Sequence, residues 1–148
     1  MSEYDRNVAT ALPPLSGLTV EKVLATPGPT EEWEGVTQET LNRFSVVVGE
    51  TGTYFPYYRH GALVGYKCRK HTTDHSNRFH AVGDCQDVEL FAQRLCSGKD
   101  SLVITEGEKD ACSVWEMLQG VYDVVSIPTG AMADKEGQGI IHKGVLAQ

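Results

Sequence analysis

The sequence feature that most constrains the fold is a strand–helix–strand pattern between residues 102 and 128. Leu102–Thr105 is a short apolar run typical of a buried strand, and Val124–Ile127 is a second such run. The residues between them have helical spacing and end at Gly120, where a C-cap glycine belongs. Because a helix joins the two strands, they are expected to run parallel with a right-handed crossover.

The helix of this β–α–β unit is predicted by an apolar stripe made of Ala111, Val114, Trp115 and Leu118. A parallel strand needs such a face to cover it, so the stripe is expected to pack in the core. We therefore expect Trp115 to be a core residue rather than a platform on which a nucleobase stacks.

Carboxylates gather where the first strand passes into the helix. Glu106 follows the strand at its carboxyl end, where α/β proteins place ligands, and Gly107 permits a tight turn. Glu108 and Asp110 fall in the first helical turn, where the helix dipole stabilises negative charge, so helix capping explains them as well. Oxygen ligands at a strand end also suit Mg²⁺. The spacing leaves both interpretations open.

An antiparallel hairpin is predicted upstream of this unit. Tyr54–Tyr58 and Leu63–Arg69 have the composition of strands, and residues 59–62 supply the reversal. Side chains alternate between the two faces of a strand, so Lys67 and Arg69 are expected to share one face. Two cations at this spacing suit phosphate groups, and they equally suit a solvated strand face.

The other segments carry weaker patterns. Residues 1–30 contain four of the six prolines and are expected to be a flexible lead-in. Thr37 is a suitable N-cap for a short helix. We further expect a strand at 44–48, a polar loop at 71–80, an amphipathic helix at 88–95 and an irregular tail at 132–148.

Charge is distributed unevenly along a chain whose formal net charge is −7. Residues 57–80 hold five basic residues and one acid, whereas residues 84–123 hold nine acids and three bases. A basic segment followed by an acidic one suits a site for phosphates and a metal, and it also describes two ordinary solvated faces. The net acidity by itself does not indicate a nucleic-acid-binding protein.

The four cysteines form no closely spaced pair, and no stretch is apolar enough to span a bilayer. The N-terminus is polar and does not resemble a signal peptide. We therefore expect the thiols to be reduced and the protein to be cytoplasmic, without membrane contact. A zinc site is not expected, because the spacing of the nearest candidate ligands is irregular: Cys68, His71, His75, His80 and Cys85.

Several segments together carry a family resemblance. ITEGEKDA, followed by a helix and VVSIPTGA, resembles the opening of a TOPRIM domain, the metal-binding fold of primases, topoisomerases and some nucleases. TYFPYYRHGALVGYKCRK resembles the hairpin that precedes this domain in the bifunctional DNA primase-helicases of short-tailed phages and their mitochondrial helicase relatives. EGVTQETLNRFSVVVG and ELFAQRL resemble neighbouring segments of that family, so the ordered match covers residues 32–131.

The resemblance implies roles for four residues. Glu106 matches the TOPRIM glutamate, which binds metal or moves protons, and Asp110 matches the second acidic metal position. Lys67 and Arg69 match a Lys-x-Arg strand that faces nucleotide and template. The implied activity is synthesis of RNA primers on single-stranded DNA from nucleoside triphosphates, with Mg²⁺. A helicase domain would lie in the full-length protein, and a phage protein would act in the host cytoplasm.

The sequence also departs from the family. No Asp-x-Asp pair follows Val125, and there is no Walker A motif, so we expect a fragment without catalytic activity by itself. The expected fold is α+β, with a helix-plus-hairpin lobe at 31–85 and a partial α/β TOPRIM lobe at 86–131. Self-association is expected through an uncovered apolar edge at Val124–Ile127. The alternatives are a TOPRIM nuclease and a non-catalytic module that binds single-stranded DNA or a partner.

Overall fold

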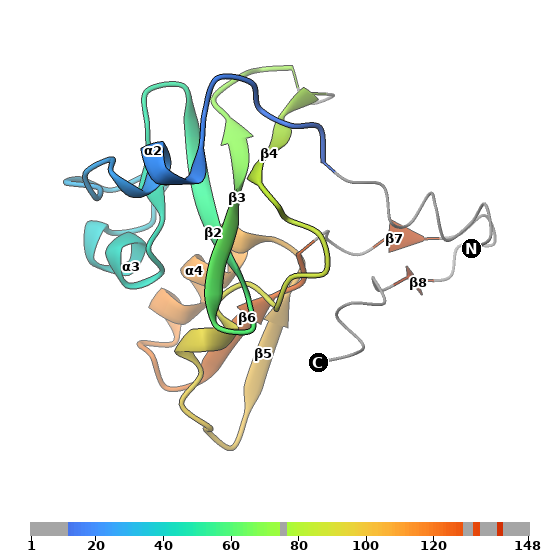
Figure 1. Ribbon diagram of the computed structural model, residues 1–148. Coiled ribbons are helices and arrows are strands. Elements are labelled where there is room, and N and C mark those ends of the chain that lie inside the picture. Colours follow the sequence, from blue (N-terminus) through green and yellow to red (C-terminus); the bar gives the residue numbers. More distant parts are fainter. Residues whose placement is uncertain (1–11, 75–76, 129–131, 134–138, 141–148) are drawn as a thin grey trace.

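The computed structural model describes residues 12–74, 77–128, 132–133 and 139–140. An antiparallel sheet has the strand order β1-β2-β3-β4, and a parallel pair, β5-β6, lies with helix α4 below the hairpin in Figure 1. The strands of the two sheets are β1 Val47–Val48, β2 Gly52–Arg59, β3 Ala62–Lys70, β4 Phe79–Gly83, β5 Leu102–Thr105 and β6 Asp123–Ser126. The expected α+β fold class is confirmed.

The hairpin has the predicted strands and reversal. β2 and β3 pair antiparallel, and the turn between them places His60 at φ 49° and Gly61 at φ 79°. Two left-handed residues give the turn a twist that matches the strands. β4, however, extends the sheet where the end of a polar loop was expected, because Phe79–Gly83 pairs with residues 65–69 of β3.

The β–α–β unit also forms as predicted, with α4 at Glu108–Met117 and β5 parallel to β6. Trp115 packs in a T-shaped contact on Phe44, with ring centroids 5.9 Å apart, and is partly buried. The first strand differs from expectation, because Leu102 and Ile104 on one face of β5 are 49% and 59% exposed.

The segment at 88–95 is not the predicted amphipathic helix. Phe91 instead exchanges backbone hydrogen bonds with Ser126 of β6, and Ala92 is left-handed at φ 67°. Only a single 3-10 turn, η2 at Gln93–Leu95, follows. The apolar residues are nevertheless buried as their spacing suggested, since Val88 and Phe91 belong to the core.

The N-terminal segments are more regular than predicted. Within the expected lead-in, Pro13 and Leu15 bond through their backbones to Ala81 of β4, and helix α2 forms at Val20–Leu24. Residues 1–11 lie outside the described residues. The predicted strand at 44–48 is shorter, because Phe44 ends the preceding helix and only β1 remains extended.

Helix α3, at Gln38–Arg43, begins as predicted, with the Thr37 side chain accepting a hydrogen bond from the Thr40 N–H. It packs beside α4 (Figure 1). One cluster of buried side chains joins the expected lobes: Val36, Leu41, Phe44, Val46, Phe55, Tyr57, Val88, Phe91, Ala92, Ala111, Cys112 and Val124.

Part of the expected irregular tail also has structure. β7 at Met132–Ala133 pairs antiparallel with β8 at Gly139–Ile140, and the rest of residues 132–148 lies outside the described residues. In the described part of the chain, no helix has the length and apolarity that crossing a membrane requires.

Candidate functional site

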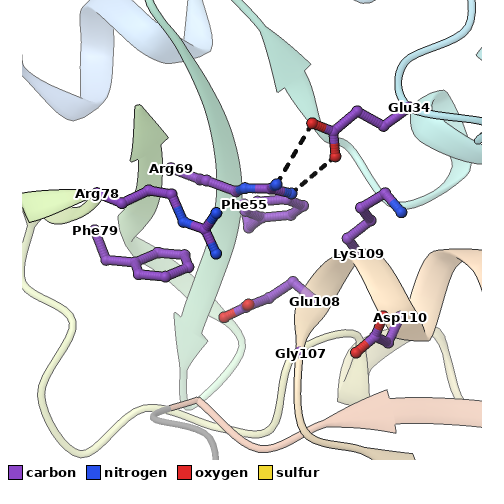
Figure 2. A pocket seen from close by; sticks show the side chains of 9 residues that line it. All are labelled: Glu34, Phe55, Arg69, Arg78, Phe79, Gly107, Glu108, Lys109 and Asp110. Atoms are coloured by element: carbon purple, nitrogen blue, oxygen red, sulfur yellow. Dashed lines mark hydrogen bonds and ion pairs between the residues drawn. The ribbon is translucent and has the colours of Figure 1, made fainter. Parts of the chain in front are cut away.

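A cleft of about 310 Å³ lies between the hairpin sheet and the first turn of α4. Three cations and three carboxylates line it, together with two aromatic rings and a glycine: Arg69, Arg78, Lys109, Glu34, Glu108, Asp110, Phe55, Phe79 and Gly107. Figure 2 shows the Arg69 guanidinium reaching Glu34 from the strand, while the Glu108 carboxylate points from the helix toward the side of Phe79. Such a mixed-charge cleft can hold phosphate groups beside carboxylates.

A buried polar network lies at the floor of this region. The Lys67 ammonium is 2.9 Å from the Glu108 carboxylate, to which the Tyr57 hydroxyl also donates at 2.6 Å. The same Lys67 Nζ donates to the Pro128 carbonyl at 3.1 Å. Burial raises the pKa of Tyr57 well above its usual range, and the neighbouring Glu108 carboxylate raises this pKa further. The network therefore joins the hairpin to α4 and to the segment that follows β6.

Arg69 lies on the same face as Lys67, as predicted, but in a different environment. Its guanidinium forms an ion pair with Glu34 at 3.0 Å and lies over the Trp33 ring, 5.3 Å from its centroid. Lys67 is 8% exposed, so it is a buried, paired cation and not part of a solvated face. Of the two predicted cations, Arg69 is the one that lines the cleft.

The predicted acidic residues are both exposed, and only Asp110 lines the cleft. Glu106 follows β5 directly and is not among the lining residues. Within the described ranges, no group of three or more His, Cys, Asp or Glu side chains is placed to hold a metal ion. Glu106 and Asp110 supply carboxylates of the type that Mg²⁺ prefers, but the described residues do not fit a complete metal site.

A second cavity of about 340 Å³ continues from the first, since both are lined by Glu34, Arg69 and Arg78. It adds further cationic and polar side chains beside an indole ring: Trp33, Lys70, His71, Thr72 and Thr73. Arg69, Lys70, His71 and Arg78 all fall within the basic segment at 57–80. Trp33 and Glu34 lie outside it, and nothing local in the sequence connects them with the hairpin.

Cys68 lies on the opposite face of β3, as the alternation predicts. It is buried in a second cluster with Tyr54, Tyr66 and Val82. Burial raises the pKa of the Cys68 thiol. His71, three residues further on, shares a hydrogen bond of 2.8 Å with the Thr53 hydroxyl instead.

No protein-family model matches the sequence. The chain is 37% identical over 78 residues to the DNA helicase/primase of Enterobacteria phage T3, a match covering 53% of this chain and 13% of that protein. The chain thus spans about an eighth of the length of this curated relative.

Two solved structures from bacteriophage T7 are also similar. One is a chain of a complex in which the lagging-strand DNA polymerase interacts with primase domains bound to an RNA/DNA hybrid and dTTP. That match has 30% identity and a TM-score of 0.50, and it covers 62% of this chain and 42% of the other. The primase fragment of the T7 primase-helicase shares the fold, with a TM-score of 0.60, 24% identity and coverage of 82% and 52%. The chain is therefore similar, in sequence and in fold, to the primase part of phage primase-helicases.

Proposed function

We propose that this chain is part of a phage DNA primase-helicase and serves DNA replication by binding the phosphate groups of single-stranded DNA and nucleoside triphosphates in its cleft. The observation that carries the proposal is the cleft itself. It brings Arg69 of β3 and Arg78, the residue before β4, to the turn that opens α4, within a chain similar to phage primases. In the longer protein, we propose, the cleft belongs to the site that synthesises RNA primers in the host cytoplasm.

The proposed role of each residue follows from its environment. Arg69 and Arg78 present planar guanidinium groups, which bind phosphate oxygens in pairs. Lys67 is held by Glu108 and Pro128, so its proposed role is to position the cleft wall. Glu106 and Asp110 are proposed as ligands of Mg²⁺, which would neutralise phosphate charge when bound.

Two other functions share parts of this site. A non-catalytic module that binds single-stranded DNA is favoured by the described carboxylates, because Glu106 and Asp110 do not complete a metal site. This alternative needs the same cleft and differs only in chemistry. A TOPRIM nuclease would use Glu106 as well, but it has no need for the basic hairpin face.

The proposal is tested by fluorescence anisotropy with a labelled single-stranded oligonucleotide. Arg69→Ala and Arg78→Ala should each weaken binding, and each should reduce the slope of log K against log salt concentration by about 0.7, the value for one phosphate contact on a single strand. The matched control is Arg59→Ala, since Arg59 pairs with Asp84 at the far end of the hairpin and lines neither cavity. Unchanged affinity in both cleft variants would contradict the proposal.

A further inference from the structure

Glu34 lies in a tight turn whose backbone is unusual for a glutamate. Trp33 and Val36 exchange two backbone hydrogen bonds of 3.0 and 2.9 Å around Glu34 and Gly35. Glu34 has φ 46° and Gly35 has φ 82°, so both are left-handed. Asn, Asp or Gly is typical at the first of these positions, because a longer L-residue is disfavoured there. The chain therefore holds Glu34 in a conformation that costs free energy.

The turn is anchored on both sides, so the fold determines where Glu34 lies. Val36 is fully buried in the core. The Trp33 ring packs against Phe55 of β2, with centroids 6.1 Å apart. The next residue, Thr37, donates from its hydroxyl to Glu116 of α4 at 2.6 Å. Glu34 is thus presented to the cleft by a rigid support.

The carboxylate of Glu34 binds Arg69 with both of its oxygens. The two contacts, to Nη1 and Nη2, measure 3.0 and 3.4 Å, and both are drawn in Figure 2. A guanidinium group uses the same paired donors to bind phosphate. The Glu34 and Arg69 side chains are 44% and 21% exposed, and an ion pair this exposed stabilises a fold by little. Its contribution is comparable to the cost of the left-handed glutamate, so stability does not explain the arrangement.

We propose that Glu34 occupies the phosphate position on Arg69 and thereby sets the affinity of the cleft for phosphate-bearing ligands. The inference rests on the proposed function, because it concerns the same cleft. A ligand that uses Arg69 must displace a carboxylate. A single phosphate that displaced Glu34 would replace one anion on Arg69 by another and gain little binding free energy. A polyphosphate or a phosphodiester chain gains more, because its other phosphates also contact the neighbouring cations. Glu34 therefore selects ligands that carry several phosphates.

The test compares two variants with a charge-matched control. Glu34→Gln keeps the shape of the side chain and removes its charge, and Glu34→Asn removes the charge while suiting the left-handed backbone. Glu32→Gln is the control, because it removes the same charge two residues away and Glu32 forms no ion pair with any described residue. The probes are labelled oligo(dT) and inorganic tripolyphosphate, which separate the strand from the nucleotide as the source of phosphate.

Both Glu34 variants should bind at least one probe about fivefold more tightly, the equivalent of about 1 kcal/mol, the upper end for an exposed ion pair. The gain should disappear when Arg69→Ala is added. Equal gains in the Glu32 control would overturn the inference, since net charge alone would then explain them. If Arg69→Ala weakens binding but neither Glu34 variant strengthens it, the inference fails and the proposed function stands. If no variant binds either probe, the proposed function fails, and the inference fails with it.

Discussion

Lys67 and Arg69 are two residues apart on β3 and share a face, yet they have different partners. Lys67 is enclosed between Glu108 and the Pro128 carbonyl, and Arg69 is held between Glu34 and the Trp33 ring. The difference follows from depth, because Lys67 lies under the α4 turn and Arg69 lies where the cleft opens. A variant that removes both cations therefore mixes a loss of folding with a loss of binding.

The buried ion pair between Lys67 and Glu108 leads to a prediction about the free energy of unfolding. Lys67→Met should lower the free energy of unfolding by about 3–5 kcal/mol, because it leaves the Glu108 carboxylate buried without a cation. Adding Glu108→Gln should recover part of this loss, since a neutral amide still accepts from Tyr57 and costs less to bury. Urea denaturation measures both variants. Lys70→Met, on the same strand, is the control, and an equal loss there would contradict the prediction.

At the level of elements, α3 and α4 are joined by one carboxylate. Glu116 accepts hydrogen bonds from the Thr37 backbone N–H at 2.9 Å and from the Thr37 and Thr40 hydroxyls at 2.6 and 2.7 Å. These hydrogen bonds from Thr37 and Thr40 hold the pKa of Glu116 below its usual range. The start of α3 is therefore tied to the last turn of α4.

This contact predicts a pH-dependent stability. A carboxylate whose folded pKa lies below its unfolded value, about 4.3 for glutamate, stabilises the fold fully above that value and loses its contribution as pH falls through the folded pKa. Glu116→Gln should lower the unfolding free energy by about 1 kcal/mol at pH 7 and flatten its decline below about pH 4. Thermal denaturation across this range measures the effect. Glu39→Gln on α3 is the control, and a Glu116 variant with the wild-type profile would contradict the assignment.

Elements whose signals are local were predictable from the sequence. The hairpin, α3 and the β–α–β unit follow from alternation, an N-cap and helical spacing within each segment. The structure of the segment at 88–95 was not predictable in this way. Its apolar spacing also suits an extended chain, and that chain bonds to Ser126, a partner distant in sequence. The residues of the cleft were likewise only partly predictable from local sequence. Arg69 and Asp110 were predicted as site residues, whereas Glu34 reaches Arg69 only through the tertiary fold.

For the whole molecule, we predict that the 148-residue chain makes no primers from template, Mg²⁺ and nucleoside triphosphates. Metal-assisted phosphoryl transfer needs several carboxylates around the ions, and within the described residues no three His, Cys, Asp or Glu side chains are placed to hold one. A gel assay with labelled nucleotides measures the products. Template-dependent primers would contradict the prediction. In a longer protein that is active, Glu106→Gln should abolish synthesis.

Self-association is predicted through a different surface from the one that the sequence suggested. Val124, Val125 and Ile127 are buried, so they form no apolar edge. The exposed apolar face belongs to β5, at Leu102 and Ile104. Ile104→Lys should therefore shift the chain toward monomer in sedimentation equilibrium, because a charge on an open strand opposes pairing. Lys99→Glu, in the turn before β5, is the control, and an unchanged association constant in the Ile104 variant would contradict this assignment.

The core cluster that runs from Val36 to Val124 crosses the boundary expected near residue 85. Phe55 and Phe91 meet there at 5.8 Å, and Phe44 contacts Trp115. Because the rings of the two halves bury one another, we predict that the two halves fold together as one unit. Cleaving the connection between β4 and β5 should leave a nicked but associated pair, whereas either half expressed separately should be captured by chaperones or degraded.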